Sequence, residues 1–247
     1  MKPLVRLRGL WSAIEPGALA LRAGRCPFCG PSLMLRLADE ETRVRCLRCG
    51  ASAIHLSMGW SLLGALAGTR PGAAYELSSR GALVRWLRRR ARSLQCSEFF
   101  DDVPPGGERD GVRCEDVQQL RLPDACFDLV THTEVFEHVP DDAAGLRELH
   151  RVLRPGGLMV FTVPMSAAAR TVERARSTPA GVEHLLPPAY HGDRIRGEGR
   201  VLVYRDYGLD LVERVAAAGF DRVRLDPPDP RVPWNHGRRV VVATKEA

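Results

Sequence analysis

The sequence predicts an α/β protein whose main part is a parallel sheet covered by helices, with a small cysteine-rich module in front of it. The first observation is the segment 127–164, which reads as strand, polar loop, helix, turn and strand. The second is a pair of Cys-x-x-Cys motifs, Cys26/Cys29 and Cys46/Cys49. With 247 residues and 45% hydrophobic content, the chain can form one catalytic-sized domain plus a smaller attachment.

The segment 127–164 can be justified element by element. A short apolar strand begins at Phe127. Apolar side chains then recur at helical spacing on one face, at Ala143, Leu146, Leu149 and Leu153. Negative charge at Asp141 favours a helix start, and Pro-Gly-Gly at 155–157 favours its end. The apolar run 158–163 predicts a strand that is buried on both faces of a parallel sheet.

This segment resembles the second half of the class I S-adenosylmethionine (SAM)-dependent methyltransferases, of the methyltransferase type 11 kind. The matching motifs are FDLV at 127–130, EHVPD at 137–141 and ELHRVLRPGG at 148–157. The resemblance covers about residues 70–247 and implies a Rossmann-like seven-stranded sheet with an antiparallel last strand, SAM as cofactor and methyl transfer as activity. A different doubly wound domain with the same helix and turn is the alternative.

We therefore expect three parts along the chain. An N-terminal zinc-ribbon region covers 1–56, a small and glycine-rich linking helix covers 57–72, and the methyltransferase domain covers 73–247. Within that domain, the polar and irregular segment 167–200 would lie over the strand ends as a substrate lid.

The four paired cysteines predict a structural zinc site. Cys26 and Cys29 are separated from Cys46 and Cys49 by sixteen residues, and each pair is followed by a glycine. Two such turns can present four thiolates to one Zn²⁺, and four protein ligands leave no open position for catalysis. Disulfides are the alternative, which a reducing cytosol disfavours. A small hairpin is expected between the pairs, from 33–37 and 42–44.

Charge and hydropathy limit the classes of binding partner that we expect. The net charge of +6 is mild, and most of the basic excess is arginine, with a dense run of arginines at 85–92. This run fits a solvated helix face better than a phosphate-binding one, although nucleic acid stays open as a partner. We expect no membrane span, because no apolar run is long enough. The basic N-terminus is too interrupted for a signal-peptide core, so a cytoplasmic location is expected.

Expected cofactor contacts begin after the first strand, 73–77. The resemblance implies that Glu76, Ser78, Arg80 and Gly81 approach the methionine part of SAM, although the usual glycine-rich loop reads here as Glu-Leu-Ser-Ser-Arg-Gly-Ala at 76–82. Only one glycine of that loop is left to relax the turn. We hypothesise that the guanidinium of Arg80 compensates by pairing with the carboxylate of SAM.

Further cofactor contacts are expected after the next strands. Glu98 ends the second strand, 22 residues after Glu76, which is a spacing typical of an acid that binds ribose hydroxyls. The resemblance implies that Asp116 and Val117, after the third strand, contact the adenine, and that His132, at the end of the fourth strand, also lies in the cofactor site.

The loop after the fourth strand is the expected site of chemistry, because ligands of open α/β sheets collect at the carboxyl ends of strands. Glu134, Glu137 and His138, with His191, resemble the set that holds a divalent ion in quinone-ring O-methyltransferases and in terminal 2′-O-methyltransferases of small RNAs. Mg²⁺ or a similar ion would lower the pKa of an acceptor hydroxyl. Metal-free base catalysis and a purely architectural role stay open as alternatives.

The resulting functional prediction is a SAM-dependent methyltransferase that modifies a hydroxyl of a small molecule or glycan. RNA methylation is a second interpretation, favoured by the combination of ribbon and arginine run. A third is a non-catalytic methyltransferase fold in which the ribbon binds a protein.

Overall fold

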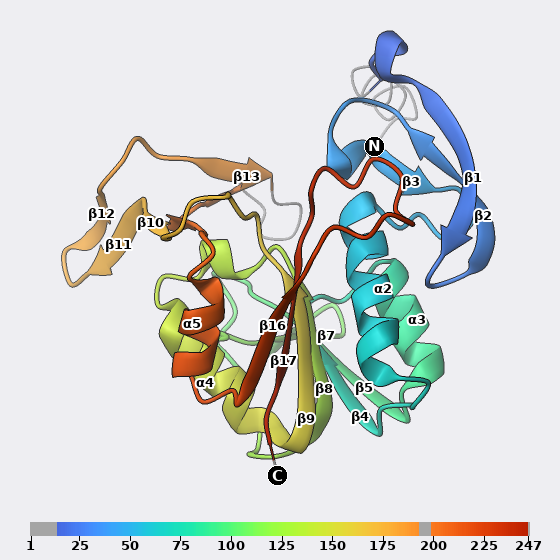
Figure 1. Cartoon of the computed structure of the whole chain (residues 1–247). Coiled ribbons are helices and arrows are strands. Elements are labelled where there is room, and N and C mark those ends of the chain that lie inside the picture. The colour runs from blue at the N-terminus through green and yellow to red at the C-terminus, as the bar shows by residue number, and fades with distance from the viewer. Residues whose placement is uncertain (1–13, 193–198, 247) are drawn as a thin grey trace.

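The computed structural model describes residues 14–192 and 199–246, and its centre is a twisted eight-stranded sheet (Figure 1). The strand order is β16-β17-β9-β8-β4-β5-β7-β6. The bounds are β4 (Ala73–Glu76), β5 (Ser93–Glu98), β6 (Glu108–Arg109), β7 (Val112–Cys114), β8 (Phe127–Thr133), β9 (Leu153–Thr162), β16 (Arg222–Asp226) and β17 (Val240–Thr244). The predicted α/β class is confirmed.

Most neighbours in this sheet are parallel, and the last strand is antiparallel as predicted. β4, β5, β7, β8 and β9 run parallel, whereas β17 is antiparallel to both β9 and β16. The sheet has one strand more than the expected seven, because the two-residue β6 pairs antiparallel with β7 at the edge. So short a strand gives almost no periodic signal in a sequence.

Helices cover the two faces of the sheet. α2 (Ala53–Leu66) and α3 (Ala82–Arg90) lie on one face, and α4 (Asp142–Val152) and α5 (Leu211–Ala217) lie on the other (Figure 1). Each face of the sheet has its own hydrophobic core, and alternate residues of one strand pack into the two cores. Val160 of β9 packs on the α2 side, and Phe161 packs on the α4 side. This double burial explains the continuous apolar run of β9.

Two predicted element boundaries differ from the structure. The linking helix begins at Ala53, four residues before the expected start, because the Ser52 hydroxyl accepts from the His55 N–H and caps it. The helix α4 ends at Val152, and β9 begins at the next residue, Leu153. The Pro-Gly-Gly at 155–157 therefore lies inside the strand, not at the helix end.

The N-terminal region is a three-stranded antiparallel sheet, not only a hairpin. Its strands are β1 (Ala20–Cys26), β2 (Gly30–Arg36) and β3 (Val44–Cys46), in the order β1-β2-β3. Two short 3₁₀ turns accompany them, η1 (Pro16–Ala18) and η2 (Glu41–Arg43). The predicted hairpin corresponds to β2 and β3, and β1 was missed because its residues are mostly exposed and do not alternate clearly. We call residues 14–52 the ribbon.

The ribbon and the sheet share a hydrophobic core. Met34 and Val44 of the ribbon belong to the same buried cluster as Met58 of α2 and Val160 of β9. The connection between β16 and β17 also reaches the ribbon, as the red loop in Figure 1 shows. There the Arg36 guanidinium lies 5.1 Å from the ring centre of Trp234.

Residues 172–192 and 199–206, which include most of the predicted lid segment 167–200, form short antiparallel strand pairs that project from the body (Figure 1), and we call them the lid region. Its strands are β10 (Val172–Glu173), β11 (Ala175–Thr178), β12 (Gly181–His184), β13 (Tyr190–Gly192), β14 (Arg200–Leu202) and β15 (Arg205–Asp206). The buried Arg205 anchors them: its guanidinium donates to the carbonyl oxygens of Phe136, Val139 and Pro140 at 3.0, 2.6 and 2.7 Å. Within the described part of the chain, we find no helix with the length and apolar character of a membrane span.

Candidate active site

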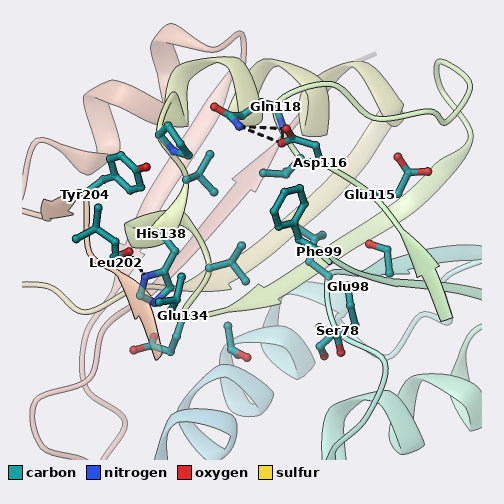
Figure 2. A pocket seen from close by; sticks show the side chains of 18 of the residues that line it. Ser78, Glu98, Phe99, Glu115, Asp116, Gln118, Glu134, His138, Leu202 and Tyr204 are labelled. Carbon is teal, nitrogen blue, oxygen red and sulfur yellow. Dashed lines mark hydrogen bonds between the residues drawn. The ribbon is translucent and has the colours of Figure 1, made fainter. Parts of the chain in front are cut away.

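A cavity of about 400 Å³ opens at the carboxyl ends of β4, β5, β7 and β8, and the lid region closes its far side (Figure 2). One wall carries Ser78, Glu98 and Asp116, which follow or end three successive strands. The opposite wall carries Glu134 and His138. The cavity is therefore large enough for a nucleoside-sized ligand and has polar groups on two sides.

The wall with Ser78, Glu98 and Asp116, which we call the cofactor wall, contains four of the residues predicted to bind SAM. Ser78, Glu98, Asp116 and Val117 all line the cavity. The carboxylate of Asp116 accepts from the backbone N–H and side-chain amide of Gln118, at 2.9 and 3.1 Å, which fixes its orientation. Their roles as SAM ligands stay predictions.

The first loop is fixed by carboxylates rather than by glycines. The backbone N–H and hydroxyl of Ser79 both donate to Glu98 Oε1 at 2.8 Å. Below this loop, the buried carboxyl group of Glu76 accepts from Ser78 Oγ at 2.7 Å and from the hydroxyl of Thr131. Burial raises the pKa of Glu76 to about 7, so its carboxyl group changes charge near neutrality.

The other four predicted cofactor residues, Glu76, Arg80, Gly81 and His132, are not among the described residues that line the cavity. Gly81 instead begins α3 with a positive φ of 119°. His132 is fully buried in the core, where its ring stacks 4.5 Å from the Phe161 ring. Burial lowers the pKa of His132 to about 3, so it is a neutral core residue beneath the site.

The predicted catalytic residues come from the 3₁₀ turn η3 (Phe136–His138), the residues before it and the lid strand β13. Glu134 and His138 line the cavity, while Glu137 is buried with 1% exposure and is not among the described lining residues. His191 approaches from the lid, and its ring centre is 4.9 Å from that of His138. The structure thus brings together residues that lie more than fifty positions apart.

Three of these side chains form a cluster with metal-ligand chemistry. One ligand atom each from Glu137, His138 and His191 lies within 4.8 Å of the others. Glu137 Oε1 is 3.5 Å from His138 Nε2 and 3.6 Å from His191 Nδ1. Neither carboxylate oxygen of Glu137 has a hydrogen-bond partner among the described residues. The buried acid is therefore suited to a cation or to a proton donor.

Glu134 is not part of this cluster and instead forms an ion pair with Arg238. Its Oε1 lies 3.0 Å from Nη1 of Arg238, which is on the connection between β16 and β17. The structure thus assigns Glu134 an intramolecular partner that the sequence motif did not predict. Burial and the neighbouring Glu137 act to raise the pKa of Glu134, whereas the guanidinium of Arg238 acts to lower it and favours the charged form.

The sequence missed several cavity residues. Phe99 and Gln118 follow the predicted acids on the cofactor wall, and Tyr204 lines the opposite wall (Figure 2). Phe99 carries a signal that could have been used, because it is an aromatic residue directly after the acid that ends β5. Residues 193–198 of the predicted lid segment 167–200, and residues 1–13, lie outside the described residues.

The four ribbon cysteines also converge. The Sγ atoms of Cys26 and Cys49 are 3.5 Å apart, as are those of Cys29 and Cys46, and all four lie within 4.8 Å of one another. A tetrahedral Zn²⁺ with bonds of about 2.3 Å to sulfur would separate the sulfur atoms by about 3.8 Å. The donor set and its spacing therefore fit a zinc ion.

Comparison with known proteins supports the same fold. Residues 79–161 match the family model described as a methyltransferase domain. The solved 1,6-didemethyltoxoflavin-N1-methyltransferase of Burkholderia thailandensis, which holds S-adenosylhomocysteine, superposes with a TM-score of 0.50 at 20% identity, covering 79% of each chain. The central unit has the methyltransferase fold.

The proteins similar in sequence to this chain include N-methyltransferases that act on amines. The dimethylglycine N-methyltransferase of Parasynechococcus marenigrum is 32% identical over 162 residues, which cover 63% of this chain and 57% of the relative. The sarcosine/dimethylglycine N-methyltransferase of Halorhodospira halochloris is 32% identical over 121 residues, covering 49% and 37%. The chain thus spans 57% of the length of the first relative and 37% of the second.

Proposed function

We propose that this chain is a SAM-dependent methyltransferase that acts on a small-molecule acceptor. The observation that carries the proposal is the cavity that places Ser78, Glu98 and Asp116 opposite Glu134 and His138. The match of residues 79–161 to the methyltransferase domain supports it. A cavity with separate polar walls suits a reaction that needs cofactor and acceptor aligned in one site.

SAM would be held by the wall that ends β4, β5 and β7. Glu98 is suited to accept hydrogen bonds from ribose hydroxyls, and Asp116 to accept from an adenine amino group. When bound, SAM supplies an electrophilic methyl group on a sulfonium. The chain's own residues then bind and orient the two reactants and exclude water, which is most of what methyl transfer requires.

The opposite wall, with Glu134 and His138, would face the acceptor. Its side chains and the neighbouring Glu137 and His191 are suited to remove a proton from an acceptor nitrogen or oxygen. Glu137 raises the pKa of His191, and this acid–histidine pair can take a proton from an acceptor that binds beside it. A hydroxyl of a small molecule or glycan, which the sequence analysis predicts, is one candidate for the methyl acceptor. The names of the relatives point instead to nitrogen, so an amine is the first acceptor to test.

The proposal also includes a divalent metal ion that assists the reaction. Glu137, His138 and His191 would hold a divalent ion such as Mn²⁺ or Mg²⁺, because carboxylate and imidazole ligands suit such ions. Glu134 is not included, since it pairs with Arg238. The ribbon cysteines Cys26, Cys29, Cys46 and Cys49 would hold a separate structural Zn²⁺.

Calorimetric titration with SAM tests the cofactor part of the proposal. Saturable binding with one site is expected, and no binding at millimolar SAM would leave only a non-catalytic role. Transfer of radiolabelled methyl groups then separates the acceptors, with sarcosine and dimethylglycine compared with catechols, sugars and total RNA. Label in the amine fraction alone would assign nitrogen, whereas label in catechols or sugars would assign oxygen.

A further inference from the structure

Arg238 lies between the ribbon and the cavity and contacts both. It is 8% exposed, and its Nη1 donates to the Val163 carbonyl oxygen at 2.6 Å and to Glu134 Oε1 at 3.0 Å. On its other side, Nε donates to Glu41 Oε2 at 3.0 Å, and Nη2 also bonds to Glu41. One guanidinium therefore joins a ribbon carboxylate to a cavity carboxylate, which its fixed fork of donors permits.

The Glu134 end of this bridge belongs to a loop that forms much of one cavity wall. Thr133, Glu134, Val135 and His138 all line the cavity. The Glu134 backbone has a positive φ of 54°, which is unfavourable for a residue with a side chain. Its N–H bonds to the Thr162 carbonyl oxygen at 2.9 Å, so the surrounding contacts hold this conformation in place.

The Glu41 end of the bridge lies in the ribbon. Glu41 begins η2, between the two cysteine pairs, and its side chain is 21% exposed. It is not among the described residues that line the cavity. The neighbouring Glu40 instead faces solvent and pairs loosely with Arg43 at 3.6 Å. Two adjacent glutamates of the ribbon thus have different surroundings, and only Glu41 meets Arg238 among their described contacts.

We propose that Glu41 and Arg238 are positioning residues for the active site: the ribbon, through Glu41, holds Arg238 in the place from which it orients Glu134 and its loop. The inference rests on the proposed function, because it assumes that the cavity binds SAM. It assigns the ribbon a part in forming the active site. Neither Glu41 nor Arg238 needs to touch a reactant for this role.

A double-mutant cycle on the full chain tests the proposal. Its readout is the dissociation constant of SAM, because the Glu134 loop lines the same cavity as Ser78 and Glu98. Glu41→Gln keeps the shape of the side chain but removes the charge that anchors Arg238. Glu134→Ala removes the carboxylate at the other end. Glu40→Gln is the matched control, with the same charge change one residue away and no contact to Arg238. Thermal unfolding of each variant is measured in parallel.

We expect Glu41→Gln to weaken SAM binding about tenfold in the native background and less than about twofold in the Glu134→Ala background, since coupled residues are not additive. Arg238→Lys, which keeps the charge but lacks the planar fork of five donors, should restore only part of the binding lost in Arg238→Gln. Glu40→Gln should bind SAM like the unmodified chain.

Equal weakening by Glu41→Gln in both backgrounds would overturn the inference, because the ribbon would then act only through general stability. Unchanged SAM binding in Glu41→Gln would also overturn it. Failure of the unmodified chain to bind SAM is a separate result, which removes the proposed function itself. The two failures are thus distinguishable.

Discussion

Glu137 Oε1 lies 3.6 Å from His191 Nδ1, and this contact joins the loop after β8 to the lid. If the cluster of Glu137, His138 and His191 binds a divalent ion, Mn²⁺ should bind with one site in a titration followed by electron paramagnetic resonance. Removing one of three ligands by His191→Ala should weaken this binding at least about tenfold. His184→Ala, an exposed histidine of β12, is the control. Absence of Mn²⁺ binding in the unmodified chain would leave His191 and Glu137 as a metal-free base.

The affinity for SAM should depend on pH through Glu76. Burial raises the pKa of Glu76 to about 7, so its carboxyl group is mainly charged at pH 8 and mainly neutral at pH 6. SAM carries a positive sulfonium, and a nearby carboxylate favours its binding. We expect the affinity to fall by up to about tenfold between pH 8 and pH 6. Calorimetry at both values checks this, and Glu76→Gln should flatten the dependence; an unchanged slope in that variant would exclude Glu76 as the cause.

Zinc removal should unfold the ribbon. The purified chain should contain one equivalent of zinc by elemental analysis, and Cys29→Ser should lose it, because structural zinc sites need all four ligands. Since Cys46 belongs to the buried cluster shared with α2, the thermal midpoint should fall as well. Cys126→Ser, outside the ribbon, is the matched control. A Cys29→Ser variant that kept both its zinc and its thermal midpoint would contradict the predicted site.

Arg205 should be needed for the lid to stay in place. Its guanidinium satisfies three carbonyl oxygens at 136, 139 and 140, and Arg205→Ala would leave buried polar groups without partners. We expect the free energy of unfolding to fall by about 3 kcal/mol. Denaturant titration checks this value against Arg176→Ala, which breaks only the exposed pair with Glu183. Equal stability of the two variants would contradict the anchoring role.

Much of the cofactor wall could be predicted from the sequence. Glu98 and Asp116 follow strands that pair in parallel, so their positions at one sheet edge follow from topology. Of the four predicted catalytic residues, Glu137, His138 and His191 have ligand atoms within 4.8 Å of one another, whereas Glu134 pairs with Arg238. Their catalytic roles stay predictions. The positions of Glu98, Asp116, Glu137 and His138 share a cause, because each residue lies at or shortly after the carboxyl end of a strand of the central sheet.

The rest could not be predicted, because it depends on contacts between distant segments. Arg238 pairs with Glu134 across 104 positions and with Glu41 across 197, and no local pattern indicates either contact. In the sequence, His132 lies near the end of a strand, where a side chain can face either a ligand or the core. Only the packing of Phe136 and Phe161 around its ring shows that it belongs to the core.

The shared hydrophobic cluster of the ribbon, α2 and the sheet has a consequence for folding. Because Met34, Met58 and Val160 pack in one core, the ribbon does not have a separate interior of its own. The ribbon and the sheet should therefore melt in a single cooperative transition, seen as one peak in scanning calorimetry. A fragment that starts at residue 73 would expose the apolar face that α2 covers, and such a surface promotes aggregation.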